Sequence, residues 1–494
     1  MQSLPLNRAT VARSLSLARP TPRQAAVLLG LALASLVLGI EIWRNLRLAA
    51  YLDHIEGNIV IGGWLWAQAG APIYALQDGY AQFANIYGPL AYLADLPAML
   101  ALGPGIVASK LPAAVALVAT LGLTAWRFRR AAPMAAIQGM FLLIAGFAAL
   151  SPMSFWTRAD PFEALLVAAA LAGAASPVFI GLCIGLAVNF KIHAFLYFLP
   201  ILWELWTRRG WRAAPPVVVV SLATFFAPFL LPGISLHDYF AILAQQIGGR
   251  AHTSELLAPV LAYGVALALP VLLPLCRRHI PWAERSYGIA AMASLVLIAY
   301  PASNPGAGPY HFLPLLPALA EARMRLKPAG IGGEFAVFPL LFFAAATTSL
   351  ALGQIAERQS WPALADEALA LAREAPPGTV DIGYGDNKRS YEVAQLAKAE
   401  LSLHGYPRWI DGQILMELRK TGVDGSRRWV AYMTGCEVER WLLPRGEKPF
   451  AVSSYFYDDD RPLFDDAFRA AFVANYHEAV SSPHFTIWEC SHSE

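Results

Sequence analysis

Apolar segments of membrane-spanning length recur along this chain from about residue 24 to residue 353. They predict eleven transmembrane helices, at 24–42, 107–126, 134–150, 161–175, 177–190, 193–206, 214–232, 258–276, 286–300, 311–321 and 331–353. The hydrocarbon core of a bilayer is about 30 Å thick, which about 20 helical residues cross. The shorter segments would tilt little or thin the bilayer locally. The fold class expected is therefore mainly α, a polytopic transmembrane helical bundle.

The composition agrees with a location in lipid. Of the 494 residues, 57% are hydrophobic and 15% are charged, whereas a soluble domain usually carries about 25% charged residues. The net charge is only +2, and no basic run indicates nucleic acid as a partner. The first apolar run ends in Glu41, Arg44 and Arg47 rather than in a cleavage site of small residues. We therefore expect an uncleaved first helix.

The distribution of basic residues predicts the orientation of the bundle. Basic residues cluster before the first helix and in four later loops, with members at Arg127, Arg208, Arg277 and Arg323. All five clusters fall on the cytoplasmic side if residues 87–102 form an interfacial or re-entrant segment instead of a span. Aspartate and two prolines within that segment favour this interpretation. The expected orientation has the N-terminus in the cytoplasm and the C-terminus outside.

Four regions then face outward: 43–106, 151–160, 233–257 and 301–310. Acidic, basic and aromatic residues concentrate in these regions, whereas the cytoplasmic loops are short and basic. Polar groups at a membrane boundary are costly unless they have a function. An outward-facing site is therefore expected.

The composition becomes that of a soluble protein after residue 353. We predict two parts, a transmembrane part at 1–353 and an extracytoplasmic α/β domain at 354–494. Strands are expected at 378–384 and 429–433 with β-prone pieces at 450–456 and 484–489, and helices at 388–403 and 410–420. Cys436 and Cys490 lie in this domain, and an oxidising compartment would allow them to form a disulfide. Two free thiols are the alternative.

Short motifs in the outward regions carry the most specific information. Glu56 is followed fourteen residues later by Gly70, and the sequence Tyr-Gly-Pro-Leu follows at 87–90. Arg-Ala-Asp-Pro opens a later helix at 158–161, and 310–319 reads YHFLPLLPAL. In this arrangement the chain resembles the GT-C class of membrane glycosyltransferases, in the branch of the bacterial aminoarabinose transferase and the protein O-mannosyltransferases. The resemblance covers residues 25–350 in topology, but its motifs cover only a few dozen residues.

The resemblance implies an enzyme that moves a sugar from a polyprenyl-phosphate carrier to a lipid, glycan or protein acceptor outside the cytoplasmic membrane. Such transfer needs a base that takes the proton of the acceptor. The family has an Asp-Glu pair after the first helix, but this chain has Ile55 beside Glu56. Either Glu56 alone serves as the base, or Asp53 substitutes. Asp160 is the second outward acid, expected to help bind the acceptor, a metal or the base.

A leaving phosphate needs positive charge or hydrogen-bond donors as its own charge develops. The residues expected to bind the substrate are Arg158, Tyr87, Lys191, Arg250, His252, Tyr310 and His311. A divalent cation is compatible with this chemistry, but no motif requires one.

Each candidate also has a structural explanation. Glu56 and Asp53 would be solvated loop acids, and Asp160 would cap a helix whose first position is a proline. Lys191 would extend to the lipid headgroups, and Tyr310 would belong to an interfacial aromatic belt. Two other functions stay open on the same residues, a transporter or lipid flippase and a non-catalytic membrane assembly protein. The former predicts ionisable residues deep inside several spans, and the latter predicts that Glu56 lies far from Asp160.

Overall fold

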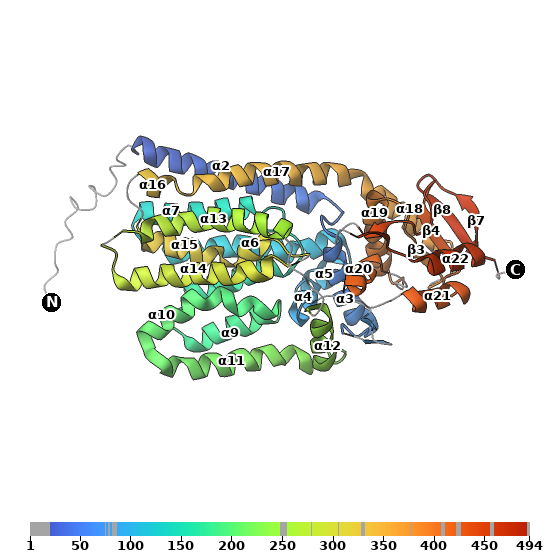
Figure 1. Ribbon diagram of the computed structural model, residues 1–494, viewed down its shortest axis with the longest axis horizontal. Coiled ribbons are helices and arrows are strands. Elements are labelled where there is room, and N and C mark those ends of the chain that lie inside the picture. Colours follow the sequence, from blue (N-terminus) through green and yellow to red (C-terminus); the bar gives the residue numbers. More distant parts are fainter. Residues whose placement is uncertain are drawn as a thin grey trace, which may run out of the picture.

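The computed structural model describes residues 20–491, apart from residues 75, 78–79, 82–85, 248–253, 278, 305, 328–330, 377, 407–410, 421–425 and 455–458. Arg250 and His252 therefore lie outside the described residues. Most helices run along the long axis of the molecule, and the C-terminal strands lie at the end opposite to the start of α2 (Figure 1).

Each of the eleven predicted spanning segments contains helix in the structure. The bundle consists of α2 (Pro22–Arg47), α6 (Ile106–Phe128), α7 (Pro133–Ala149), α8 (Ala159–Ala172), α9 (Pro177–Val188), η2 and α10 (Ile192–Phe198, Leu199–Arg209), η3, α11 and η4 (Gly210–Ala213, Ala214–Phe226, Ala227–Leu230), α13 (Ser254–Leu275), α14 (Trp282–Ala302), η5 and α15 (Pro309–Leu315, Leu316–Arg325), and α16 and α17 (Ile331–Phe335, Phe338–Glu357). Within the described chain, five stretches are long and apolar enough to cross a membrane by themselves. The chain is an integral membrane protein.

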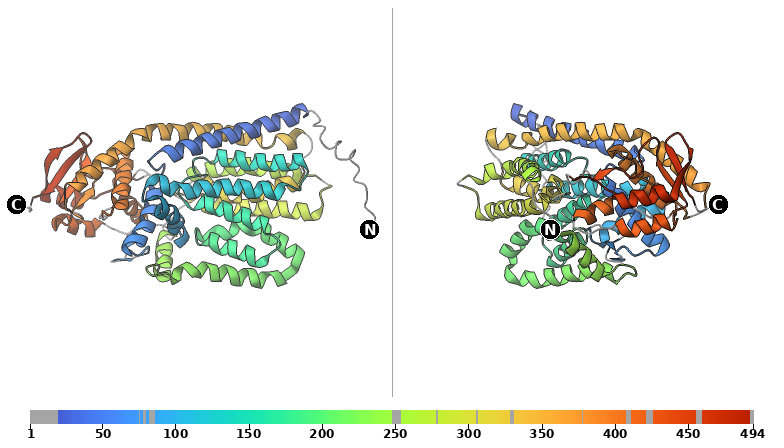
Figure 2. Two further views of the ribbon diagram at one scale, coloured as in Figure 1. Left: turned by 180° about the vertical axis from the view of Figure 1, so that it is seen from behind. Right: turned by 45° about the vertical axis from the view of Figure 1, so that its right-hand side comes forward.

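Helix α2 illustrates how the sequence separates its two faces. The buried residues Gly30, Ala34 and Leu38 recur every four positions, which places them on one side of the helix. Leu29 and Leu36 point away from that side and are each 61% exposed. Small residues on the inner side let helices approach closely in lipid. This face packs against α7 and α17, and α17 lies beside α2 in both views (Figures 1 and 2).

The C-terminal end of α2 is capped by a lysine of another helix. Lys110 of α6 is fully buried, and its Nζ donates hydrogen bonds to the carbonyls of Asn45 (3.1 Å), Leu48 (2.9 Å) and Ala50 (2.5 Å). The last carbonyls of a helix have no partner within it. This contact therefore fixes the point at which region 43–106 leaves the bundle.

Region 43–106 contains one helix of 16 residues and several shorter elements after the end of α2. They are α3 (His54–Ala69), the strands β1 (Leu76–Gln77) and β2 (Tyr80–Ala81), α4 (Pro89–Leu93) and α5 (Leu96–Leu102). A helix of seven residues rises about 11 Å, so neither α4 nor α5 alone can cross a bilayer. That residues 87–102 form an interfacial or re-entrant segment stays a prediction. The short elements lie with α12 (Leu236–Ile247) between the bundle and the C-terminal region (Figure 1).

The C-terminal region is an α/β unit around a small sheet. Its elements are η6 (Arg358–Ser360), α18 (Trp361–Arg373), β3 (Val380–Ile382), α19 (Lys388–Leu403), α20 (Gly412–Lys420), α21 (Ser426–Thr434), β4 (Arg440–Pro444), β5 (Ser453–Ser454), β6 (Asp459–Pro462), α22 (Asp466–Asn475), β7 (Tyr476–Ser481) and β8 (Phe485–Cys490). The four-stranded sheet has the order β3-β4-β8-β7, and only β3 and β4 are parallel.

The predicted strand at 429–433 was wrong, because these residues lie in helix α21. Trp429 and Met433 are buried, whereas Ala431 between them is exposed. Burial every four residues is the pattern of a helix face, and a strand would bury every second residue. The segment is too short for its apolar letters to distinguish the two periods.

Two contacts define how the C-terminal region is held. Cys436 and Cys490 form a disulfide, with their Cα atoms 6.0 Å apart. Helix α19 packs against α3, and Arg358 forms an ion pair of 2.8 Å with Glu392 of α19. The C-terminal region therefore rests directly on the first outward region of the membrane part (Figure 2).

Candidate functional site

Glu56 lies in the first turn of α3 and is buried, with only 1% of its surface exposed. Its Oε1 accepts hydrogen bonds from the backbone N–H groups of Leu52 (2.8 Å) and Asp53 (3.0 Å). Its Oε2 accepts a hydrogen bond from the backbone N–H of Thr157 at 2.7 Å. Both carboxylate oxygens are therefore engaged, and Glu56 ties the start of α3 to the second outward region.

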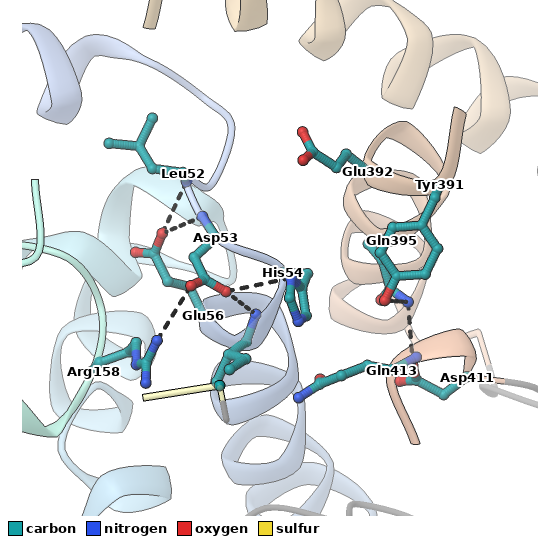
Figure 3. A network of polar contacts seen from close by, with 12 residues as sticks. Leu52, Asp53, His54, Glu56, Arg158, Tyr391, Glu392, Gln395, Asp411 and Gln413 are labelled. Carbon is teal, nitrogen blue, oxygen red and sulfur yellow. Dashed lines mark hydrogen bonds and ion pairs between the residues drawn. The ribbon is translucent and has the colours of Figure 1, made fainter. Parts of the chain in front are cut away.

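Asp53 is the N-cap residue of α3 and forms a capping box with Glu56. Its Oδ1 accepts a hydrogen bond from the N–H of Ile55 at 2.7 Å, while its Oδ2 lies 3.2 Å from Nη1 of Arg158. His54 lies on the other side, with Nδ1 3.5 Å from Oδ1. The Asp53 side chain is 21% exposed, and Figure 3 shows it between Arg158 and His54. Asp53 is therefore the more accessible of the two acids.

The surroundings of the two acids shift their pKa values in opposite directions. Burial is the largest influence on Asp53 and alone would raise its pKa, but His54, Arg158 and the Ile55 N–H together lower it below the ordinary value. Burial also raises the pKa of Glu56, and Lys110 and the Thr157 N–H only partly oppose that effect. The surroundings therefore favour the charged form of Asp53, whereas burial disfavours the charged form of Glu56.

Arg158 lies at the centre of the cluster and is buried. Besides Asp53, its guanidinium contacts the hydroxyl groups of Tyr87 and, at 3.2 Å, of Tyr310. Its Cζ also lies 4.1 Å from the ring centroid of Trp156. Three segments far apart in the sequence therefore meet at this one guanidinium.

Asp160 and Lys191 form a second buried charge pair. Asp160 lies inside the first turn of α8 and is not its N-cap, since that position is held by Arg158. Lys191 is 5% exposed and lies 5.3 Å from the ring centroid of Tyr310. Its ammonium thus points into the protein and not toward lipid headgroups. Oδ2 of Asp160 has no hydrogen-bond partner among the described residues.

Gly88 explains why Tyr87 lies beside Lys191. The Gly88 N–H donates a hydrogen bond to the carbonyl of Phe190 at 3.1 Å. A Cβ at position 88 would lie 2.1 Å from the carbonyl oxygen of Asn189, so only glycine fits this close approach. The Tyr-Gly-Pro-Leu motif is therefore a packing motif that places the Tyr87 ring in the cluster.

A pair of histidines extends the cluster toward the bundle. Nδ1 of His311 lies 3.2 Å from Nε2 of His193, and the two rings stack with centroids 5.1 Å apart. His193 also lies 3.4 Å from the hydroxyl of Tyr197. The sequence interpretation selected His311 but missed His193, which stands inside an apolar stretch without any motif.

A polar cavity of about 200 Å³ lies between α3 and the C-terminal region. It is lined by Tyr51, Leu52, Asp53, His54, Gly57, Gln354, Arg358, Trp361, Lys388, Glu392, Gln395 and Leu396. Asp53 therefore faces Arg158 on one side and this cavity on the other. No residue of the C-terminal region was a candidate from the sequence, because Arg358, Lys388 and Glu392 reach the cavity beside Asp53 only in the folded chain. Figure 3 shows Glu392 on the helix that faces Asp53 and His54.

The cluster thus unites eight of the ten candidate residues, Glu56, Asp53, Asp160, Arg158, Tyr87, Lys191, Tyr310 and His311. Arg250 and His252 are the two outside the described chain. Among the described residues, no group of three or more His, Cys, Asp or Glu side chains is arranged to hold a metal ion.

The helical bundle and the C-terminal α/β region together have a GT-C-like fold. Two solved structures share it, both of ArnT from Cupriavidus metallidurans. The one bound to undecaprenyl phosphate is 13% identical in sequence, with a TM-score of 0.58 over 95% of this chain and 98% of that chain. The apo structure is 12% identical, with a TM-score of 0.54 over 94% and 97%. No protein-family model matches the sequence, and comparison with curated proteins finds no match.

Proposed function

We propose that this protein is a membrane glycosyltransferase that transfers a sugar from a polyprenyl-phosphate donor to an acceptor on the extracytoplasmic side. One observation carries the proposal. The carboxylate of Asp53 lies between a polar cavity and Arg158, whose guanidinium contacts two tyrosines beside Lys191. A base, a cavity for an acceptor and buried cations for a phosphate are the parts that such a transfer requires.

In the proposed reaction Asp53 is the general base. It takes the proton from the acceptor hydroxyl or amine while the acceptor atom attacks the anomeric carbon of the donor sugar. The bond from that carbon to the phosphate oxygen breaks, and its electron pair leaves with the polyprenyl phosphate. Glu56 is a positioning residue in this scheme, because its two oxygens already accept three backbone hydrogen bonds.

Arg158 and Lys191 are proposed to stabilise the charge that develops on the phosphate, with Tyr87 and Tyr310 as further donors. Asp160 would orient Lys191 through their ion pair. The attraction of Arg158 lowers the pKa of Asp53, and a phosphate bound at Arg158 would weaken that attraction. Donor binding would therefore raise the pKa of Asp53 and strengthen it as a base.

Two features support the proposed orientation in the cytoplasmic membrane. The loops that follow α6, α10, α13 and α15 carry the basic residues and lie at one end of the bundle, whereas the C-terminal region lies at the other end (Figure 1). The positive-inside rule would place the basic end in the cytoplasm and the C-terminal region outside. The disulfide between Cys436 and Cys490 suits an oxidising compartment such as the periplasm. The domain organisation proposed remains a membrane part at 1–353 and an extracytoplasmic domain at 354–494.

The experiment is sugar transfer by the purified protein in lipid, with a panel of polyprenyl-phosphate sugars and membrane extracts as acceptors. The variants are Asp53→Asn, Glu56→Gln and Asp160→Asn. Asp366→Asn is the control, because Asp366 is an exposed acid on α18 outside the cluster. Transfer by wild type and the control, with a loss of about a hundredfold or more in Asp53→Asn, would support the proposal.

Donor that neither binds nor turns over would overturn the proposal and favour a transporter or a non-catalytic assembly protein. Against the assembly protein stands the position of the acids, since Glu56 accepts a hydrogen bond from Thr157, three residues before Asp160. An assembly protein has no need to bring these acids together in a buried site.

A further inference from the structure

An apolar groove lies between α10 and α14, at the end of the bundle away from the acidic site. Its volume is about 550 Å³, and it is lined by Leu199, Leu202, Trp203, Trp206, Trp282, Ser286, Ile289, Ala290 and Ala293. The lining positions recur every three or four residues on each helix, so each helix contributes one continuous face. We propose that this groove binds an anionic phospholipid, with an acyl chain along the groove and the phosphate at the flanking arginines.

The shape of the groove follows from the sizes of its residues. Helix α14 contributes the small residues Ser286, Ala290 and Ala293, which leave a hollow beside α10. Trp206 and Trp282 stand at its sides and are 53% and 68% exposed. Large exposed indoles are typical of the level of the lipid headgroups. The hollow therefore begins at the headgroup level and continues into the apolar layer.

The charges at the mouth of the groove select the kind of lipid. Arg209 stands three residues after Trp206, and Arg285 stands three residues after Trp282, so each arginine lies on the same helix side as its tryptophan. Neither guanidinium has an ion-pair partner among the described residues. Arg209 is exposed, Arg285 is half-buried, and Arg212 adds a further exposed cation. Basic pockets between transmembrane helices at the cytoplasmic surface are suited to anionic headgroups.

Three acids lie near these arginines, and none forms an ion pair with Arg209 or Arg285 among the described residues. Glu284 precedes Arg285 in the chain and offsets one of the positive charges at the groove mouth. Glu204, on α10, is paired with Arg325 at 2.8 Å and with Arg208. Glu321 is paired with Arg325 at 2.7 Å. These pairs form a separate buried network, so positive charge remains at the groove mouth for a phosphate group.

The test is native mass spectrometry of the delipidated full-length protein, titrated with phosphatidylglycerol or phosphatidylcholine of identical acyl chains. Arg209→Gln combined with Arg285→Gln removes the charges, and Ala293→Trp fills the groove. The matched controls are Arg129→Gln combined with Arg130→Gln, an exposed pair at the end of α6, and Val296→Trp, which adds the same bulk on the lipid-facing surface outside the groove.

We expect wild type to prefer phosphatidylglycerol, by about fivefold in affinity for each arginine. This preference should disappear in the arginine double variant and in Ala293→Trp, and persist in both controls. Equal binding of the two lipids by wild type would overturn the proposal, because ordinary annular lipid would then fill the groove. Persistence in Ala293→Trp, or loss in the Arg129 and Arg130 control, would also overturn it. None of these outcomes depends on the proposed transferase activity.

Discussion

The variants Asp53→Asn and Glu56→Gln should distinguish the proposed base from the residue that positions it, although the two acids lie within one turn of α3. Asparagine caps a helix about as well as aspartate, so Asp53→Asn keeps the hydrogen bond from the Ile55 N–H. The lost ion pair leaves the Arg158 guanidinium, which is only 3% exposed, without its carboxylate, but the guanidinium keeps its contacts with the hydroxyl groups of Tyr87 and Tyr310. The cost should therefore stay below the roughly 3–5 kcal/mol of a buried charge that loses its only partner, and the variant should still fold.

The loss of activity should exceed what this loss of stability can cause, because a folded variant still lacks the base. Removal of a general base slows a reaction about 10²–10⁴-fold, which corresponds to about 2.7–5.4 kcal/mol of transition-state stabilisation. Glu56→Gln should instead lose mainly stability, because Glu56 is proposed to position the chain and not to take the proton. Its amide NH₂ must face either the Thr157 N–H or the N–H groups of Leu52 and Asp53. Each buried donor left without an acceptor costs about 1–3 kcal/mol.

The two quantities are measured on the same preparations. Initial rates of sugar transfer give the loss of activity, and the temperature at which the detergent-solubilised protein stops eluting as a single species gives the loss of stability. We expect Asp53→Asn to be inactive and folded, and Glu56→Gln to be less stable. An active Asp53→Asn together with a stable, inactive Glu56→Gln would refute the reasoning and identify Glu56 as the base.

Three further perturbations follow from the same contacts. Arg158→Gln should raise the pKa of Asp53, because burial is then opposed by His54 without the help of Arg158. The acid limb of the kcat/KM–pH profile should therefore move to higher pH. An unmoved limb would show that Asp53 does not set it. Gly88→Ala should abolish transfer, because its Cβ would lie 2.1 Å from the carbonyl oxygen of Asn189; wild-type rates would contradict the close packing. Lys110→Met should lower the unfolding temperature, since each buried carbonyl left without a donor costs about 1–3 kcal/mol, and an unchanged temperature would exclude a capping role.

The helical part of the fold was predictable because lipid imposes a simple constraint. A spanning helix must be apolar over about 20 residues, and this pattern can be read without knowledge of neighbours. Asp95 and the two prolines favoured an interfacial or re-entrant segment at 87–102, but the division of that segment into α4 and α5 was not predicted. Segment 429–433 was not predictable, because five residues fit a helix and a strand equally well, and the packing of Trp429 and Met433 decided between them.

The sequence selected residues that lie close together in the structure, but it could not give their contacts. The motifs selected Glu56 and Asp160, but a sequence contains no hydrogen bonds. It therefore could not reveal that backbone N–H groups saturate Glu56 or that Lys191 is paired with Asp160. His193 carries no motif, and its contact with His311 spans 118 residues of sequence.

The sequence by itself determined that this chain enters a membrane, how its helices are spaced and which outward segments hold acidic and basic residues. Those properties depend on the local match between side chains and solvent. The tertiary structure alone decided which acid faces a cavity, because exposure of Asp53 and burial of Glu56 depend on where 157–158 and α19 pack. Such contacts join residues that are distant along the chain, and their energies arise only when the helices have assembled.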